Sequence, residues 1–392
     1  MPDLPIALIA LAVTAAAGYV LLRVFASTRT ATSVEDRYLE ALEAWVDGRL
    51  DDAENRLQEV VRSDTGAVEP YLQLGNLLRR TGRADKAAAM HRALMARGDL
   101  SRSQRVKAGL ALAEDLLGLG QFASAGQVLD DLVRHVGDRP AYWRARFRQW
   151  QGAGDGGEAA RALKHAADHV PEPARAVFRN DHACYQLDRA FAAALEGDES
   201  LAQRCMKAVP GGHAMARYFP LVKVVLLSGQ GHLDKALDTA AADLAGVPDA
   251  LLAFQDFVRP ILLEKNRFER SLPLLERVVQ DSAAPVELVV ELALLYEKTG
   301  RREQALTLLA AKEGRSDLTP DAAAPLLNAL IRDGQQTELQ RVWHTLHLRR
   351  RDRAWRCVAC GHAGSRLAWF CPHCFSFGAF VDAQDSREEA HA

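Results

Sequence analysis

Four cysteines near the C-terminus have the spacing of a metal site. Cys357 and Cys360 form one Cys-x-x-Cys pair, Cys371 and Cys374 form a second, and ten residues separate Cys360 from Cys371. A two-residue gap lets both thiols of a pair turn toward one point, and two such pairs supply the four thiolates of a tetrahedral site. Gly361 suits the tight turn around a metal ion. The sequence therefore predicts one metal ion bound by these four cysteines.

Redox dithiols and disulfides are the two alternative uses of these cysteines. Six cysteines among 392 residues are too few for a disulfide scaffold. Disulfides are also unusual in the reducing cytoplasm, where the N-terminal pattern described below predicts that the bulk of the chain lies. His362 and His373 are alternative ligands, although four thiolates already complete a shell. Because that shell is closed, we expect a structural role for the metal ion. An all-cysteine shell does not separate iron from zinc.

Residues 349–382 form the predicted metal-binding domain, followed by a polar tail at 383–392. So short a segment cannot bury enough apolar surface to fold alone, and metal binding would contribute on the order of 10–16 kcal/mol, as in small zinc domains. Ser365–Phe370 offers strand-like residues for a hairpin between the two pairs. The basic run from Arg349 to Arg356 is expected to be a solvated linker or a contact between this domain and the last repeat. A nucleic-acid or lipid patch is the alternative.

A repeated phrase runs through the middle of the chain. An apolar stretch ends at a glycine or asparagine, and a small residue follows five positions later. The turn positions, spaced by 34, 38, 34, 43, 34, 35, 34 and 34 residues, are Gly48, Gly82, Gly120, Gly154, Gly197, Gly231, Asn266, Gly300 and Gly334. The residues five positions later are Ala53, Ala87, Ala125, Ala159, Ala202, Ala236, Ser271, Ala305 and, as the exception, Leu339. A period of 34 is typical of tetratricopeptide repeats.

Each part of this phrase has a structural reason. Glycine and asparagine adopt the left-handed conformation that ends a helix and reverses the chain. The small residue is expected where the second helix of a hairpin crosses the first. The wider spacings before Gly120 and Gly197 predict longer helices or loops. Residues 27–348 are therefore predicted to form about nine helical hairpins, stacked as a superhelix whose groove binds peptides or protein surfaces. An irregular all-helical domain is the alternative.

The N-terminus reads as a membrane anchor. Leu4–Leu22 has 19 residues without a charge, and such a helix spans about 28 Å, close to the hydrocarbon core of a bilayer. Arg23, Arg29 and Arg37 follow this stretch and Asp3 precedes it, so the bulk of the chain is expected in the cytoplasm and the N-terminus in the periplasm. We assign residues 1–26 to the anchor. A signal peptide and a buried core helix are the alternatives.

Other candidate sites are weak. His165 and His169 share a helical face without the glutamate of a metalloprotease helix, and Asp181, His182 and Cys184 do not point together on one helix. Cys184 and Cys205 are expected to be packing thiols. Lys and Arg total 49 against 51 Asp and Glu, a net charge of −2, so no global field favours nucleic acid. The fold class is therefore all-α, with an anchor, a repeat superhelix and a small four-cysteine metal-binding domain.

The order of anchor, repeats and paired cysteines resembles the lipopolysaccharide assembly protein B (LapB) family of Gram-negative inner membranes. The segments that carry the resemblance are Asp64–Glu69, Leu74–Gly82, Trp355–Gly361 and Cys371–Cys374. The resemblance implies a non-enzymatic adaptor that presents the deacetylase LpxC to the FtsH membrane protease and so regulates lipopolysaccharide synthesis. It also implies links to lipopolysaccharide transport and sensor proteins, a rubredoxin-like four-cysteine domain, and iron as the metal ion. Homo-oligomerisation is left open.

Three other functions compete with that expectation. The first is a membrane-tethered tetratricopeptide scaffold for a different envelope assembly. The second is a rubredoxin-like electron carrier, in which the metal ion changes its oxidation state. The third is nucleic-acid binding through the arginine run, which the near-neutral chain disfavours.

Overall fold

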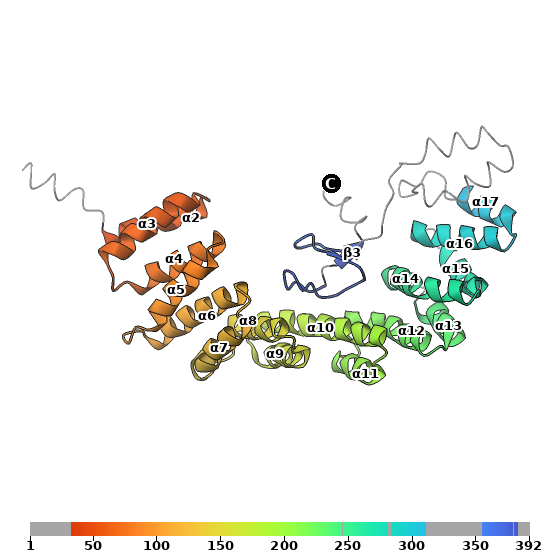
Figure 1. Cartoon of the computed structure of the whole chain (residues 1–392), viewed down its shortest axis with the longest axis horizontal. Coiled ribbons are helices and arrows are strands. Elements are labelled where there is room, and N and C mark those ends of the chain that lie inside the picture. Colours follow the sequence, from red (N-terminus) through yellow and green to blue (C-terminus); the bar gives the residue numbers. More distant parts are fainter. Residues whose placement is uncertain (1–32, 245, 281–283, 311–354, 379, 383–392) are drawn as a thin grey trace, which may run out of the picture. The chain divides into compact units, whose positions relative to one another are not determined.

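The computed structural model describes residues 33–244, 246–280, 284–310, 355–378 and 380–382 (Figure 1). The chain divides into two compact units between Ala162 and Leu163. The expected anchor at Leu4–Leu22 lies outside the described residues, and no described helix is long and apolar enough to cross a membrane. The ninth predicted turn, Gly334 with Leu339, also lies outside them.

The first unit is built from helices joined by short turns, coloured red to yellow in Figure 1. They are α2 (Val34–Val46), α3 (Leu50–Ser63), α4 (Val68–Arg80), α5 (Ala84–Met95), α6 (Arg102–Gly118), α7 (Phe122–Val136), α8 (Pro140–Gly152) and α9 (Gly156–His169), the last of which crosses the boundary. Ser33 and Ser101 begin α2 and α6 with capping boxes completed by Asp36 and Gln104, which satisfy N–H groups that the helix itself leaves unpaired.

The second unit continues the helical pattern and adds a small sheet. Its helices are α10 (Ala174–Glu196), α11 (Glu199–Ala208), α12 (Phe219–Gly229), α13 (Leu233–Asp243), α14 (Pro248–Glu264), α15 (Leu272–Val279), α16 (Val286–Lys298) and α17 (Arg302–Ala310), with short 3₁₀ turns η1 (Ala214–Tyr218) and η2 (Phe268–Ser271). The strands are β1 (Trp355–Cys357), β2 (Ala363–Gly364) and β3 (Phe380–Asp382), in the antiparallel order β2-β1-β3.

The described turn positions adopt the conformation that the sequence predicts. Gly48, Gly82, Gly120, Gly154, Gly197, Gly231 and Gly300 have φ between 71° and 82°, and Asn266 has φ 50°. After each, the next N–H donates to the carbonyl five residues back, as from Arg83 to Leu78 at 2.8 Å and from Asp198 to Ala193 at 2.8 Å. This bond is the Schellman pattern that ends a helix on a left-handed residue. The predicted chain reversals are therefore confirmed.

The small residues five positions later are buried, as predicted. Ala53, Ala87, Ala125, Ala159, Ala202 and Ala236 are 0% exposed, Ser271 is 3% exposed and Ala305 is 5% exposed. The helices on either side of these turns pack together, as α2 does with α3, α4 with α5 and α12 with α13. The wider spacings correspond to longer helices, 17 residues in α6 and 23 in α10. The described array therefore consists of tetratricopeptide-like helical hairpins.

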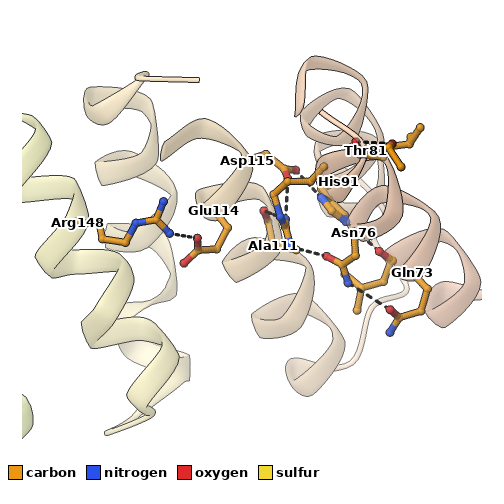
Figure 2. Close-up of polar contacts among 11 residues, drawn as sticks. Gln73, Asn76, Thr81, His91, Ala111, Glu114, Asp115 and Arg148 are labelled. Carbon is orange, nitrogen blue, oxygen red and sulfur yellow. Dashed lines mark hydrogen bonds and ion pairs between the residues drawn. The ribbon is translucent and has the colours of Figure 1, made fainter. Parts of the chain in front are cut away.

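A buried polar network joins successive hairpins in the first unit. His91 on α5 and Asp115 on α6 are both 0% exposed, and the His91 Nδ1–H donates to Asp115 Oδ2 at 2.6 Å. Nη1 of Arg79 on α4 donates to Asp115 Oδ1 at 2.7 Å. Figure 2 shows His91 and Asp115 side by side, with Asn76 near them on α4. The network therefore links three consecutive helices through one carboxylate.

Gly75 on α4 makes room for this network. A methyl group added at Gly75 would overlap the ring of His91, and His91 Nε2 lies 3.2 Å from the carbonyl oxygen of Leu72 on the same helix. The close approach of α5 to α4 thus depends on the absence of a side chain at this position.

Candidate metal centre

The two cysteine pairs form matching turns. The N–H of Gly361 donates to the Cys357 carbonyl at 2.8 Å, and the N–H of Phe375 donates to the Cys371 carbonyl at 2.8 Å. Each turn is closed by the N–H of its first cysteine, which donates at 2.9 Å to the carbonyl of His362 or of Ser376. The two halves of the site therefore repeat the same hydrogen bonds around a common centre.

The turns require a left-handed residue four positions after the first cysteine. Gly361 has φ 72° there, and Phe375 has φ 62° in the second turn. The glycine was predicted for this role, whereas a phenylalanine at this position carries a steric penalty that glycine avoids. Its ring lies 6.1 Å from that of Phe370. The second turn is therefore held in an unfavourable backbone conformation by its surroundings.

The four sulfur atoms converge as predicted. The Sγ atoms of Cys357 and Cys374 are 3.6 Å apart, and those of Cys360 and Cys371 are 3.8 Å apart. All four lie within 4.8 Å of one another. A tetrahedral ion with metal–sulfur bonds of about 2.3 Å requires sulfurs about 3.8 Å apart, far longer than a disulfide bond of about 2.05 Å. The four cysteines could thus bind one metal ion together.

The environment of the thiols differs across the site. Burial raises the pKa of Cys357 to about 12. Burial alone would raise the pKa of the Cys374 thiol as well. Hydrogen bonds with the hydroxyl and N–H of Ser376 outweigh this effect and lower the pKa of Cys374 to about 6. Cys371 is buried and Cys360 is exposed. Since metal ligands must be thiolates, binding would release protons from the site.

The domain around the cysteines is attached to α10 through the carboxylate of Asp188. Nη1 and Nη2 of Arg366 donate to the two oxygens of Asp188 at 3.3 and 3.4 Å, and the N–H of Trp369 donates to Asp188 Oδ1 at 3.3 Å. The side chain of Asp188 is 13% exposed. Burial raises the pKa of Asp188 even though the guanidinium of Arg366 lies beside it.

Aromatic side chains complete this attachment. The Trp369 ring lies 5.7 Å from that of Phe191 on α10 and 5.0 Å from that of Tyr218 in η1. The Phe370 ring meets Tyr185 of α10 edge to face at 5.3 Å. Such pairs contribute about 0.5–1.5 kcal/mol each beyond burial of area. The four-cysteine domain and the helices of the second unit therefore share one hydrophobic core.

One detail of the predicted domain is wrong. Ser365–Phe370 is not a strand; β2 lies just before it at Ala363–Gly364, and Phe370 forms only an isolated bridge with Phe377. The physical reason is that Arg366 and Trp369 turn toward α10, which draws this segment away from the sheet. Of the basic run, residues 349–353 lie outside the described residues, and Arg356 is exposed and donates to the carbonyl of Gly361 at 3.4 Å.

The weaker candidates do not join the site. His362 and His373 stack with ring centroids 5.4 Å apart. Neither belongs to the cluster of possible metal ligands, which consists of the four cysteines and is the one such cluster among the described residues. His165 and His169 stack on each other at 4.2 Å.

The buried groups of α10 are not arranged for chemistry. Burial lowers the pKa of His182 to about 4 and raises that of Cys184 to about 12. Cys205 is buried as well, and burial raises its pKa. Thiols that stay protonated at neutral pH are poor nucleophiles. Cys184 and Cys205 are therefore packing thiols, as predicted.

The residues of α10 that hold the domain were missed by sequence reasoning. Asp188, Tyr185 and Phe191 lie in an ordinary amphipathic helix, and nothing local distinguishes them. One signal existed, because Trp369, Phe370 and their neighbours are too apolar for a solvated loop.

Part of the chain is similar in sequence to a known protein. Lipopolysaccharide assembly protein B of Escherichia coli, in strains K12, O6:H1 and O157:H7, is 30% identical to the chain over 96 residues. The match covers 24% of this chain and 25% of that protein, so the chain spans about a quarter of the length of the curated relatives it matches. No family model matches the chain.

Solved structures give a weaker likeness. A tetratricopeptide repeat protein from Parabacteroides merdae has a TM-score of 0.35 and 13% identity, covering 76% of this chain and 98% of its own. The C-terminal part of a repeat protein from Cytophaga hutchinsonii has a TM-score of 0.40 and 12% identity, covering 68% and 90%. Such scores carry no argument, so the repeat assignment depends on the turns and alanines described above. The matched segment, the repeated hairpins and the cluster of four cysteines together fit the lipopolysaccharide assembly protein B family.

Proposed function

We propose that this chain is a non-enzymatic scaffold in lipopolysaccharide assembly, anchored in the inner membrane by residues 1–26 with its bulk in the cytoplasm. The observation that carries the proposal is the combination of helical hairpins with four clustered thiols that could complete the tetrahedral shell of one metal ion. Stacked hairpins offer extended surfaces for protein partners. A filled shell leaves no coordination position for a substrate.

The finer proposal concerns the partners. The repeat array at 27–348 holds the deacetylase LpxC and presents it to an FtsH-type protease, while transport and sensor proteins of the inner membrane adjust this activity. Support comes from the similarity in sequence. Anchoring both adaptor and protease in one membrane would raise their effective concentration for each other.

Depletion of the chain tests this proposal in cells. The half-life of LpxC after translation is blocked should lengthen several-fold on depletion and recover when the chain is restored. A half-life that stays the same contradicts the adaptor role. A pull-down that yields other envelope proteins and neither LpxC nor the protease would favour a scaffold for a different assembly.

The metal ion, held by Cys357, Cys360, Cys371 and Cys374, is proposed to fold residues 349–382, with iron or zinc in the site. An electron-carrier role is the second candidate, because Cys360 is exposed and electron transfer requires a short path from the metal to a partner. Replacing iron by zinc separates the two roles. A scaffold keeps its function with zinc, whereas an electron carrier loses it.

A further inference from the structure

The first described helix carries apolar side chains on the face that points away from its hairpin. On α2, Ala41 and Ala44 are 0% exposed and pack toward α3, whereas Leu39 is 56% exposed and Val46 is 88% exposed. Val46 is the most exposed large apolar side chain among the described residues. Terminal helices of stacked hairpins normally present a polar outer face, so an apolar one indicates that something covers it.

The spacing on this face suits a helical partner. Leu39 and Val46 are seven residues apart, which places them about 10.5 Å apart on one side of α2. Half-buried Leu42 lies between them. Anchors at such spacing are what an amphipathic helix offers when it binds along another helix.

The charges around this face favour a partner helix of positive charge. Glu35 and Glu43 are exposed on α2 and have no ion-pair partner within the described part of the chain, whereas Asp47 pairs with Arg49 at 3.0 Å and Asp36 accepts from the N–H of Ser33 at 3.0 Å. Anionic lipid headgroups would be repelled by these carboxylates. A second copy docking through the same face would place carboxylates against carboxylates.

We propose that this surface, formed by Leu39, Leu42 and Val46 with Glu35 and Glu43 at its edge, docks an amphipathic helix of a partner protein. That helix has an apolar stripe flanked by lysine or arginine. Its charge complements the carboxylates, and its stripe covers the leucine and valine side chains. The inference goes beyond the proposed function, since it holds for any client that the repeat array carries.

Photo-crosslinking in native membranes tests the proposal with the full-length chain. A photoreactive phenylalanine replaces Val46, and the crosslinked peptide is identified by mass spectrometry. We expect a partner segment with apolar residues at helical spacing and flanking lysine or arginine. The double variant Glu35→Lys/Glu43→Lys should lower the yield about tenfold, corresponding to a loss of about 1.4 kcal/mol. Leu39→Ser should lower it at unchanged charge.

A matched control uses another exposed valine of the same unit. Val133 on α7 is 52% exposed, and a crosslinker there with Asp131→Lys should show no such charge dependence. Unchanged circular dichroism of each variant establishes that α2 still folds. The proposal is overturned by adducts only with lipid, with a second copy or with residues 1–32 of the same chain. It is equally overturned by no adduct, or by a yield that charge reversal leaves unchanged.

Discussion

Two regions of this molecule solve the same problem, holding neighbouring elements together, by different means. In the first unit, Asp115 joins α4, α5 and α6 by accepting from Arg79 and His91. In the second unit, the four-cysteine domain contacts α10 through Asp188 and stacked aromatic rings. The first connection needs only side chains. The second involves a small domain that we propose is folded by a metal ion, so metal occupancy should affect α10 and leave α4 to α6 unchanged.

The largest effect is expected from Cys371→Ser. Cys371 is 0% exposed, and removing one of four thiolates should abolish stoichiometric metal binding and unfold the four-cysteine domain. Elemental analysis should fall from one ion per chain to almost none, and the near-ultraviolet signal of buried Trp355 and Trp369 should collapse. Cys205→Ser is the matched control, since this buried thiol lies outside the cluster. Full metal content in Cys371→Ser would contradict the assigned shell.

Gly75→Ala probes the metal-independent connection. The added methyl group overlaps the His91 ring, so we expect a loss of about 1–3 kcal/mol in the free energy of unfolding of the first unit. The double variant Gly75→Ala/His91→Ala should lose about 1 kcal/mol less free energy of unfolding than the two single variants lose together. Urea unfolding, monitored by hydrogen exchange of the backbone N–H groups in α4 and α5, measures the free energy of unfolding of the single and double variants.

The control for this prediction is Gly118→Ala. Gly118 ends α6 with nothing within 4 Å of an added Cβ, so alanine should leave the unit as stable or slightly more stable. Strict additivity of Gly75→Ala and His91→Ala would show that the close approach of α4 and α5 does not involve this pair.

A pH dependence is expected from the other buried histidine, His182. Burial lowers its pKa from 6.5 to about 4, and Lys164 adds to the shift. The unfolded chain therefore takes up this proton below about 6.5, whereas the folded chain does so only near 4. Stability of the second unit should fall by about 3 kcal/mol as pH drops through that interval. His182→Gln should flatten the profile between pH 6.5 and 4, and equal slopes in both proteins would refute the assignment.

The smallest effect is expected at the first cysteine turn. Gly361 has φ 72° with open space around it, so Gly361→Ala should cost about 1 kcal/mol and weaken metal binding about fivefold. Competition with a coloured chelator measures the affinity. His362→Ala is the control and should keep one ion per chain. Loss of the ion in this control would make His362 a ligand.

Local patterns predicted much of this molecule because their physical causes are local. A left-handed glycine ends a helix wherever it occurs, so the turns from Gly48 to Gly300 follow from spacing alone. The convergence of the cysteines follows from two short pairs. The attachment of the metal domain could not be predicted, because Asp188 and Arg366 are 178 residues apart. Phe375 was equally unpredictable, since its left-handed backbone is imposed by the fold and opposes its own preference.

Hydrogen–deuterium exchange of the full-length protein, with its metal ion and after removal by a chelator, tests the central claim most directly. We predict that peptides covering residues 355–382 and the α10 residues Tyr185–Phe191 exchange faster without the metal ion, while α4, α5 and α6 keep their protection. Unchanged protection of α10 after complete metal removal, or an equal loss in both units, would contradict the account.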